Sequence, residues 1–113
     1  MTIVVYLASA LLCISAKCYP ALVGPDTPVG IFPLARRYVQ TKGYGGDVLQ
    51  FAEDDRYVWA IHRVWLGRPA EHRLERLQGS DPERRKMVTH GCINVMPDVY
   101  ERLLAADNVE IVR

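Results

Sequence analysis

The sequence lacks an excess of charge of either sign. Its 14 Lys and Arg residues are balanced by 13 Asp and Glu residues, which leaves a formal net charge of +1. A domain that binds nucleic acid through its surface carries a basic excess, because it must neutralise phosphates. We therefore expect no nucleic-acid partner. The sequence also has no internal repeat or low-complexity tract, and its 113 residues, half of them hydrophobic, predict one globular domain over 1–113.

Long apolar runs and an amino-terminal basic cluster are also missing. Residues 1–16 are apolar enough to resemble a secretory signal, but no Lys or Arg precedes Lys17, and Ser9 interrupts the stretch. A signal peptide begins with a positive region, and a membrane-spanning helix needs about 20 apolar residues. We therefore interpret 3–7 and 11–14 as two strands, expect no membrane span and find no convincing signal peptide.

Cysteine is scarce, since the chain has three, too few for a disulfide framework. Cys13 and Cys18 could bond across a hairpin, which would indicate an exported protein. The alternative, which we expect, is two buried free thiols, because free cysteine packs as a small hydrophobe. Cys92 has no partner in either case, so its reactivity needs an explanation.

Metal-ligand spacing is absent as well. His62, His90 and Cys92 are residue types that bind metals, but no second cysteine stands at ligand spacing and no pair of histidines has the spacing of a zinc site. We expect no metal and no cofactor.

The patterns that are present predict strands first and helices later. An apolar alternation over 56–65 is the strongest strand signal, and it places His62 and Arg63 on opposite faces. Two prolines are placed to begin short helices. The sequence therefore predicts a mainly β domain with two short α-helices in its C-terminal half. Beyond the strands named above, we expect extended chain at 18–24, 30–40, 56–65 and 108–113, a glycine-rich loop at 41–47, helices at 69–78 and from Pro97, and a polar turn at 80–86.

The segment VTHGCINV, residues 88–95, carries the candidate chemistry. The nucleophile of cysteine catalysis is the thiolate, which needs a nearby base and backbone N–H donors for the oxyanion that develops on the substrate. Gly91 permits a tight turn directly before Cys92, which would aim the N–H groups of both residues at one point. Thr89 and Asn94 can hydrogen-bond the local backbone and hold that turn.

Two histidines are candidates for the base. His90 is so close to Cys92 in the sequence that the turn carries its side chain away from the thiol. His62 lies on a strand, which is a firm platform for a base. We therefore expect His62 to be the base.

Three motifs in order resemble the L,D-transpeptidase catalytic domain of the YkuD type. They are TPVGIF at 27–32, AIHRV at 60–64 and THGCINV at 89–95. The family has a TP-x-G-x-F turn, then a histidine at the end of a strand, and then [ST]-x-G-C-[IV]-[RN]. The resemblance runs from about Ile3 to the C-terminus, and it implies the β-sandwich or barrel-like fold of that family.

The resemblance implies an enzyme that acts on the stem peptides of bacterial peptidoglycan, in the periplasm or cell envelope. Cys92 would attack the carbonyl of the third residue, usually meso-diaminopimelate, and expel the terminal D-alanine. An amine of a second stem would then resolve the thioester and form a 3–3 cross-link. Water as the acceptor would make a carboxypeptidase instead. A domain of the same fold that binds murein without turnover is a further alternative. We expect a monomer.

The resemblance also assigns roles to individual residues. His62 matches the family's base, whose ring is oriented by the backbone carbonyl of the next residue, here Arg63. His90 and Gly91 would lie against the oxyanion site, with the N–H groups of Gly91 and Cys92 as donors. Thr89 and Asn94 match motif positions that support the site.

Two features depart from the family pattern. Arg63 stands where the family commonly has glycine, and strand alternation predicts that its side chain points away from the face of His62. The segment 63–88 is longer than in many relatives and is basic. One interpretation is a solvated helix face. The other is that Arg73 and Arg84 bind a carboxylate of the substrate, because the guanidinium fork suits that group.

Tyr44, in the glycine-rich loop, is either a substrate-contacting lid residue or an ordinary loop aromatic.

Overall fold

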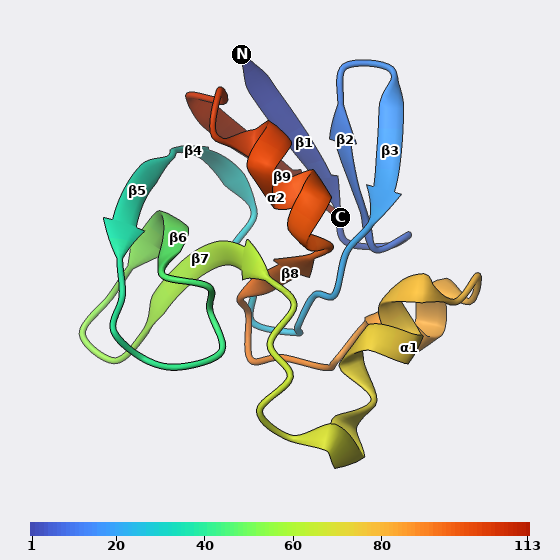
Figure 1. Cartoon of the computed structure of the whole chain (residues 1–113). Coiled ribbons are helices and arrows are strands. Elements are labelled where there is room, and N and C mark those ends of the chain that lie inside the picture. Colours follow the sequence, from blue (N-terminus) through green and yellow to red (C-terminus); the bar gives the residue numbers. More distant parts are fainter.

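The computed structural model describes all 113 residues as nine strands in two mixed sheets, with two short α-helices (Figure 1). One sheet has the order β3-β2-β1-β9-β4, and the other has the order β5-β6-β7-β8. The pairs β1–β9 and β7–β8 are parallel, and the others are antiparallel. The mainly β prediction is therefore confirmed. The strands are β1 Thr2–Tyr6, β2 Leu11–Ile14, β3 Lys17–Pro20, β4 Gly30–Pro33, β5 Ala35–Tyr38, β6 Asp47–Glu53, β7 Val58–Arg63, β8 Ile93–Val95 and β9 Asn108–Val112.

The helices all lie in the second half of the chain. They are α1 Arg73–Gln78 and α2 Pro97–Leu103, together with the 3-10 turns η1 Pro69–Glu71 and η2 Pro82–Arg85. None of them is long and apolar enough to cross a membrane. The helix predicted over 69–78 is two pieces, because His72 has a φ of 51° and ends the 3-10 turn before α1 begins. A residue in the left-handed region interrupts the i to i−4 hydrogen bonds of a helix.

The two sheets and α2 share one hydrophobic core. Alternate residues of β1 and β9 point into it, among them Ile3 and Ile111, and α2 contributes Tyr100. Each large side chain buried there stabilises the fold by about 1.5–3 kcal/mol before entropy is counted. The extended segment expected at 30–40 supplies both sheets, because β4 ends at Pro33 and β5 begins at Ala35 in the other sheet.

Two strands, β6 and β8, were not predicted. The apolar alternation of β6 is broken by an irregularity between Gln50 and Ala52, so Val48, Leu49 and Phe51 are all buried. Asp47, assigned to the loop, is the first residue of β6 and is buried beside arginines. Strand β8 is only three residues long and is buried throughout, so it shows no alternation.

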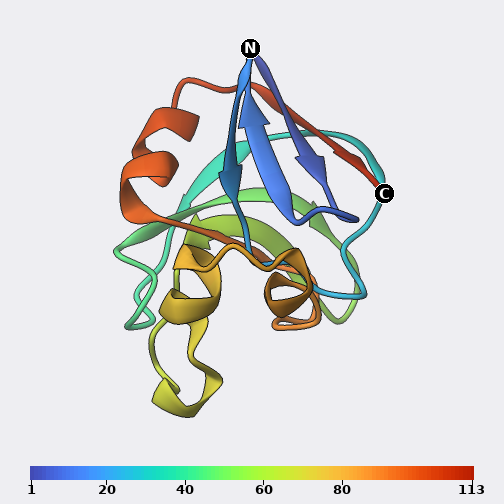
Figure 2. The same cartoon turned by 90° about the vertical axis from the view of Figure 1, so that its right-hand side faces the viewer.

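The chain between β7 and β8 forms an excursion over residues 64–92 that protrudes from the two sheets (Figures 1 and 2). A second, smaller cluster of buried apolar side chains anchors it, formed by Leu22, Val64 and Leu77. Asp81 caps η2, because its carboxylate accepts a hydrogen bond from the N–H of Glu83 at 3.0 Å. The excursion therefore has a small core of its own beside the second sheet.

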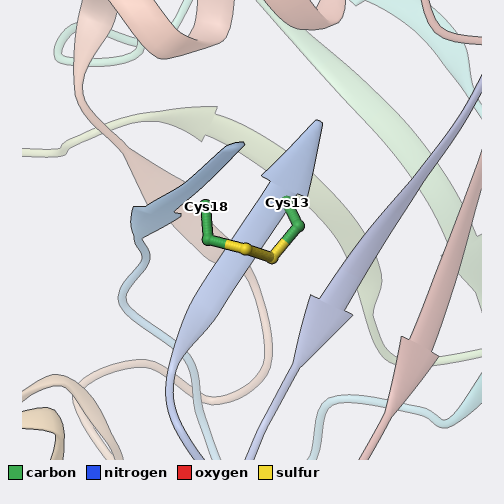
Figure 3. Close-up of a disulfide and its surroundings, with 2 residues drawn as sticks. All are labelled: Cys13 and Cys18. Carbon is green, nitrogen blue, oxygen red and sulfur yellow. A yellow bond between two sulfur atoms is a disulfide. The ribbon is translucent and has the colours of Figure 1, made fainter. Parts of the chain in front are cut away.

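Cys13 and Cys18 form a disulfide between β2 and β3 (Figure 3). The expectation of two free thiols is therefore wrong. The register of the hairpin pairs these two residues directly, which brings their sulfur atoms within bonding reach. Cys92 is the one free cysteine of the chain.

Candidate functional site

The parallel pairing of β7 and β8 brings the candidate base beside the candidate nucleophile. His62 is in register with Asn94, and Ile61 is in register with Ile93. Cys92 directly precedes β8, so strand alternation places its side chain on the same face of the sheet as His62 and Asn94. The two motifs, far apart in the sequence, therefore meet on neighbouring strands.

His62 is held as a neutral base. The residue is 3% exposed, and its Nδ1 lies 2.7 Å from the backbone carbonyl oxygen of Arg63. A carbonyl only accepts, so Nδ1 carries the proton and Nε2 is the free basic nitrogen. Burial lowers the pKa of His62 to about 4, the charge of Arg73 acts in the same direction, and the bond to Arg63 opposes both. The imidazole is therefore neutral at pH 7.

The Cys92 thiol lies against the backbone of β7. Its Sγ is 3.5 Å from the carbonyl oxygen of Val58, to which the thiol donates. Burial raises the pKa of Cys92 above its ordinary value, although a hydrogen bond from the backbone of Ala60 and the charge of Arg73 act in the opposite direction. The resting pair is therefore a neutral thiol and a neutral imidazole, so the thiol requires a base at the moment of attack.

The loop before Cys92 is braced on both sides. The hydroxyl of Thr89 donates to the carbonyl of Cys92 at 2.7 Å and closes the turn. The hydroxyl of Thr27, from the TPVGIF motif, lies 2.9 Å from the carbonyl oxygen of Gly91, and the N–H of Asp26 donates to the carbonyl of His90. Neither the N–H of Gly91 nor that of Cys92 donates to another group of the protein. Both N–H groups are therefore without a partner in the protein, as donors to an oxyanion must be.

Gly91 is required for a different reason from the one expected. Its backbone is not in the left-handed region. A Cβ at this position would stand 2.3 Å from Nε1 of Trp59 and 3.2 Å from the backbone of Asp26. Gly91 is therefore needed for close packing, and not for a conformation that other residues rarely adopt.

His62 and Cys92 open onto one cleft of about 600 Å³. Tyr44 lies in it with its ring edge-on to that of His62, at 4.7 Å between centroids. His90 is exposed at the rim and stacks on Tyr57, so it does not replace His62 as the base. The other residues that line the cleft include Trp59, Trp65, Arg68, Glu71, Arg73 and Met87.

The excursion brings one of the two predicted arginines into the cleft. Arg73 lies over the ring of Trp65 and donates to Glu71 at 2.9 Å and to the side chain of Asn94 at 3.1 Å. Asn94 is fully buried and also accepts from the N–H of Trp65, so it joins α1 to β8. Arg84 is exposed and lies outside the cleft.

Although Arg68 and Arg84 are exposed, Arg85 does not fit the solvated interpretation of the basic segment. It is 4% exposed, and its guanidinium donates to the backbone carbonyls of Ser9, Ala10 and Gly79. Its role is structural, because these bonds join η2 to the turn between β1 and β2.

The side chain of Arg63 points away from His62. Its guanidinium lies over the ring of Tyr100 and pairs with Asp47 and Glu101, each at 2.9 Å. Asp47 also accepts from Arg36 at 2.8 Å and from Tyr100 at 2.9 Å. Burial favours the neutral acid, but these hydrogen bonds prevail and hold the pKa of Asp47 below its ordinary value. The carboxylate is therefore charged.

Several residues around the site were not predicted from the sequence. Thr27 was recognised only as part of a turn motif, and Asp47 was assigned to a loop. No pattern within one segment shows such contacts, because each joins residues that are distant in the chain. No three His, Cys, Asp or Glu side chains gather as they would around a metal ion.

No model of a known protein family matches the chain, and no curated protein matches it. The resemblance to the YkuD type therefore depends on the motifs and on the arrangement of the residues that they contain.

Proposed function

We propose that the protein is a cysteine-dependent acyltransferase of the L,D-transpeptidase type that acts on peptidoglycan stem peptides. One observation carries the proposal: a neutral histidine, oriented by the carbonyl of the following residue, shares a cleft with the only free cysteine of the chain. The family's arrangement of base and nucleophile requires this geometry. The two mixed sheets around one core are compatible with the YkuD fold, which we propose as the finer classification.

The chemistry follows from the protonation states. Nε2 of His62 accepts the proton of the Cys92 thiol as the sulfur attacks the carbonyl carbon of diaminopimelate. The N–H groups of Gly91 and Cys92 stabilise the oxyanion. When the intermediate collapses, the C–N bond to D-alanine breaks and the leaving amine takes the proton from His62. A thioester and free D-alanine result.

The second half of the reaction restores the enzyme. An acceptor amine attacks the thioester carbonyl and gives its proton to His62. The sulfur then leaves and regains that proton, while the new amide forms the cross-link. Water as the acceptor would give the free acid instead, which is the carboxypeptidase alternative.

We propose that Arg73 binds a carboxylate of the stem peptide. It lines the cleft, and its side chain is 12% exposed, so a pairing there is less screened than one at the surface. Only its Nε and Nη1 are engaged, which leaves Nη2 free to donate. Arg84 lies outside the cleft, so we assign it no role in substrate binding.

The proposed location is the periplasm or cell envelope, where peptidoglycan lies. The disulfide between Cys13 and Cys18 supports this location, because disulfides persist in oxidising compartments and are rare in the cytosol. The proposed partner is a stem peptide bound by a monomer.

Covalent labelling tests the proposal directly. The protein is incubated with a carbapenem, and the intact mass is measured over time. We expect one adduct, which is absent in Cys92→Ser. His62→Asn keeps a side-chain donor for the Arg63 carbonyl but provides no base, so its acylation rate should fall at least about 100-fold. A folded wild-type protein without any adduct would contradict the catalytic proposal and favour the murein-binding alternative.

Digestion of purified sacculi identifies the substrate and the acceptor. Separation of the muropeptides should show 3–3 cross-links if an amine resolves the thioester, and shortened stems without cross-links if water does. Arg73→Lys should raise KM for stem peptides while Arg84→Lys, the matched surface control, leaves it unchanged. An equal KM in both variants would show that Arg73 does not bind the stem peptide.

A further inference from the structure

The side chain of Arg63 occupies a distinctive position behind the proposed base. Its own backbone carbonyl orients the ring of His62, at 2.7 Å from Nδ1. Its guanidinium lies on the other face of the strand, largely enclosed by β6 and α2. One residue therefore contacts the base through its backbone and a separate polar cluster through its side chain.

The same guanidinium holds the loop that carries Tyr44. Its Nη1 is 3.2 Å from the carbonyl oxygen of Tyr44 and 3.3 Å from that of Gly45. Gly45 has a φ of +79°, and a Cβ there would stand 2.8 Å from the guanidinium, so the loop packs closely against Arg63. The Tyr44 ring, in turn, packs against the ring of His62 in a T-shaped arrangement.

The guanidinium is itself held firmly. Asp47 is 4% exposed and pairs with it at 2.9 Å, and Tyr100 lies beneath it at 4.2 Å. Such a charged hydrogen bond, largely withdrawn from water, is stronger than a surface pair. Glu101 closes the cluster from α2. The loop is therefore attached to a rigid point of the fold.

We propose that Arg63 is a positioning residue for the base. Its side chain, anchored by Asp47 and Tyr100, holds the loop that packs Tyr44 against His62. This packing excludes water from the base and keeps its ring oriented. This inference rests on the proposed function, in which His62 is the base. It assigns a role to the arginine that stands where the family commonly has glycine. Tyr44 becomes a cover over the base and not an ordinary loop aromatic.

The charged and titratable groups around His62 come from several elements. Arg68, Glu71 and Arg73 line the cleft from the excursion, and His90 and Cys92 line it from the cysteine loop. None of them forms a hydrogen bond with the Arg63 side chain. A change at Arg63 therefore reaches His62 through the Tyr44 loop and through the loss of a positive charge, and the two effects can be separated.

The test is an NMR titration of the His62 ring in the folded protein, which needs no turnover. Arg63→Met should release the loop and admit water, so the midpoint should rise from about pH 4 toward the ordinary 6.5. Arg63→Lys keeps the charge beside Asp47, but its single nitrogen, on a shorter side chain, cannot bond Asp47, Glu101 and the loop carbonyls together, so it should give most of the same rise. Tyr44→Ala should also raise the midpoint. This variant tests the proposal if the Arg63 variants do not fold.

The matched control is Arg36→Met, which removes the other arginine from the same carboxylate without touching the loop. Its midpoint should stay near pH 4. The proposal is overturned if Arg36→Met moves the midpoint as far as Arg63→Met does. It is also overturned if either Arg63→Lys or Tyr44→Ala leaves the midpoint unchanged. A wild-type protein that is not acylated while Arg63→Met shifts the midpoint would refute the proposed function and leave the positioning role intact.

Discussion

Burial sets the pKa of His62, and the pKa of this residue in turn affects the stability of the fold. An exposed histidine would be half-protonated near pH 6.5, but the desolvated ring of His62 titrates at about 4. The unfolded chain therefore binds a proton that the folded protein does not bind between those two values. Linkage then requires stability to be full above about pH 6.5 and to fall as the pH decreases toward 4.

We predict that His62 lowers the free energy of unfolding by about 3 kcal/mol when the pH decreases from 7 to 4. The figure follows from the difference between the pKa of 6.5 in the unfolded chain and the pKa of about 4 in the folded protein. Urea unfolding of the wild type and of His62→Asn at both pH values isolates the effect, because other groups titrate alike in the two proteins. The wild type should lose about 3 kcal/mol more than the variant. His72→Asn, at an exposed histidine, should behave like the wild type. Equal losses in the wild type and His62→Asn would mean that the ring is hydrated.

The residues at the site differ in how far the sequence revealed them. Residue type and order were enough to select Cys92 and His62 as candidates. The need for Gly91 was found for the wrong reason, because the contact that excludes a side chain comes from Trp59, 32 positions earlier in numbering. The residue type shows which reactions a side chain can take part in. The room available for a side chain depends on neighbours that only the fold brings together.

At the scale of elements, the excursion between β7 and β8 depends on buried polar ties. Arg85 holds η2 against the turn after β1 through the carbonyls of Ser9 and Ala10, and it also bonds the carbonyl of Gly79 within the excursion. It has no carboxylate partner. A charge without a counter-ion is tolerated there because several carbonyl dipoles solvate it.

We predict that Arg85→Met lowers the free energy of unfolding by about 2–3 kcal/mol, because partly buried carbonyls lose their donor. Arg84→Met, one position away and exposed, should change it by less than about 0.5 kcal/mol. Chemical unfolding of both variants measures the difference. Similar small effects in both would mean that the excursion is attached mainly by its apolar cluster.

Individual elements were predicted unevenly. The strand predicted at 3–7, which the structure places at 2–6, the strand at 11–14 and the helix from Pro97 were confirmed because apolar periodicity and proline act locally. Strand β6 was missed because its irregularity removes the alternation, and Asp47 is buried only because two arginines from other elements pair with it. The helix over 69–78 was too long because nothing in its pattern marks His72 as left-handed.

At the scale of the whole molecule, the disulfide makes stability depend on the redox environment. The bond closes a short loop between residues five positions apart. The chain-entropy model gives about 2 kcal/mol for a loop of that size, because the bond restricts the unfolded chain. The molecule should therefore be more stable in an oxidising compartment than in a reducing one.

We predict one alkylated cysteine, Cys92, when the native protein is treated with iodoacetamide, and three after reduction and denaturation. Intact mass counts the adducts. The double variant Cys13→Ala/Cys18→Ala should unfold about 2 kcal/mol more easily than the oxidised wild type. Three adducts on the native, unreduced protein would show that the hairpin holds free thiols.

The sequence by itself determined the fold class, the order of the three motifs and the identity of the candidate nucleophile and base, because these depend on local periodicity and residue chemistry. Only the tertiary structure decided what surrounds them. It joined Cys13 to Cys18, brought Arg73 into the cleft and left Arg84 outside, and placed the Arg63 guanidinium on a buried carboxylate behind His62. These outcomes depend on strand register and on contacts between distant segments, and the sequence of any one segment does not encode its partners.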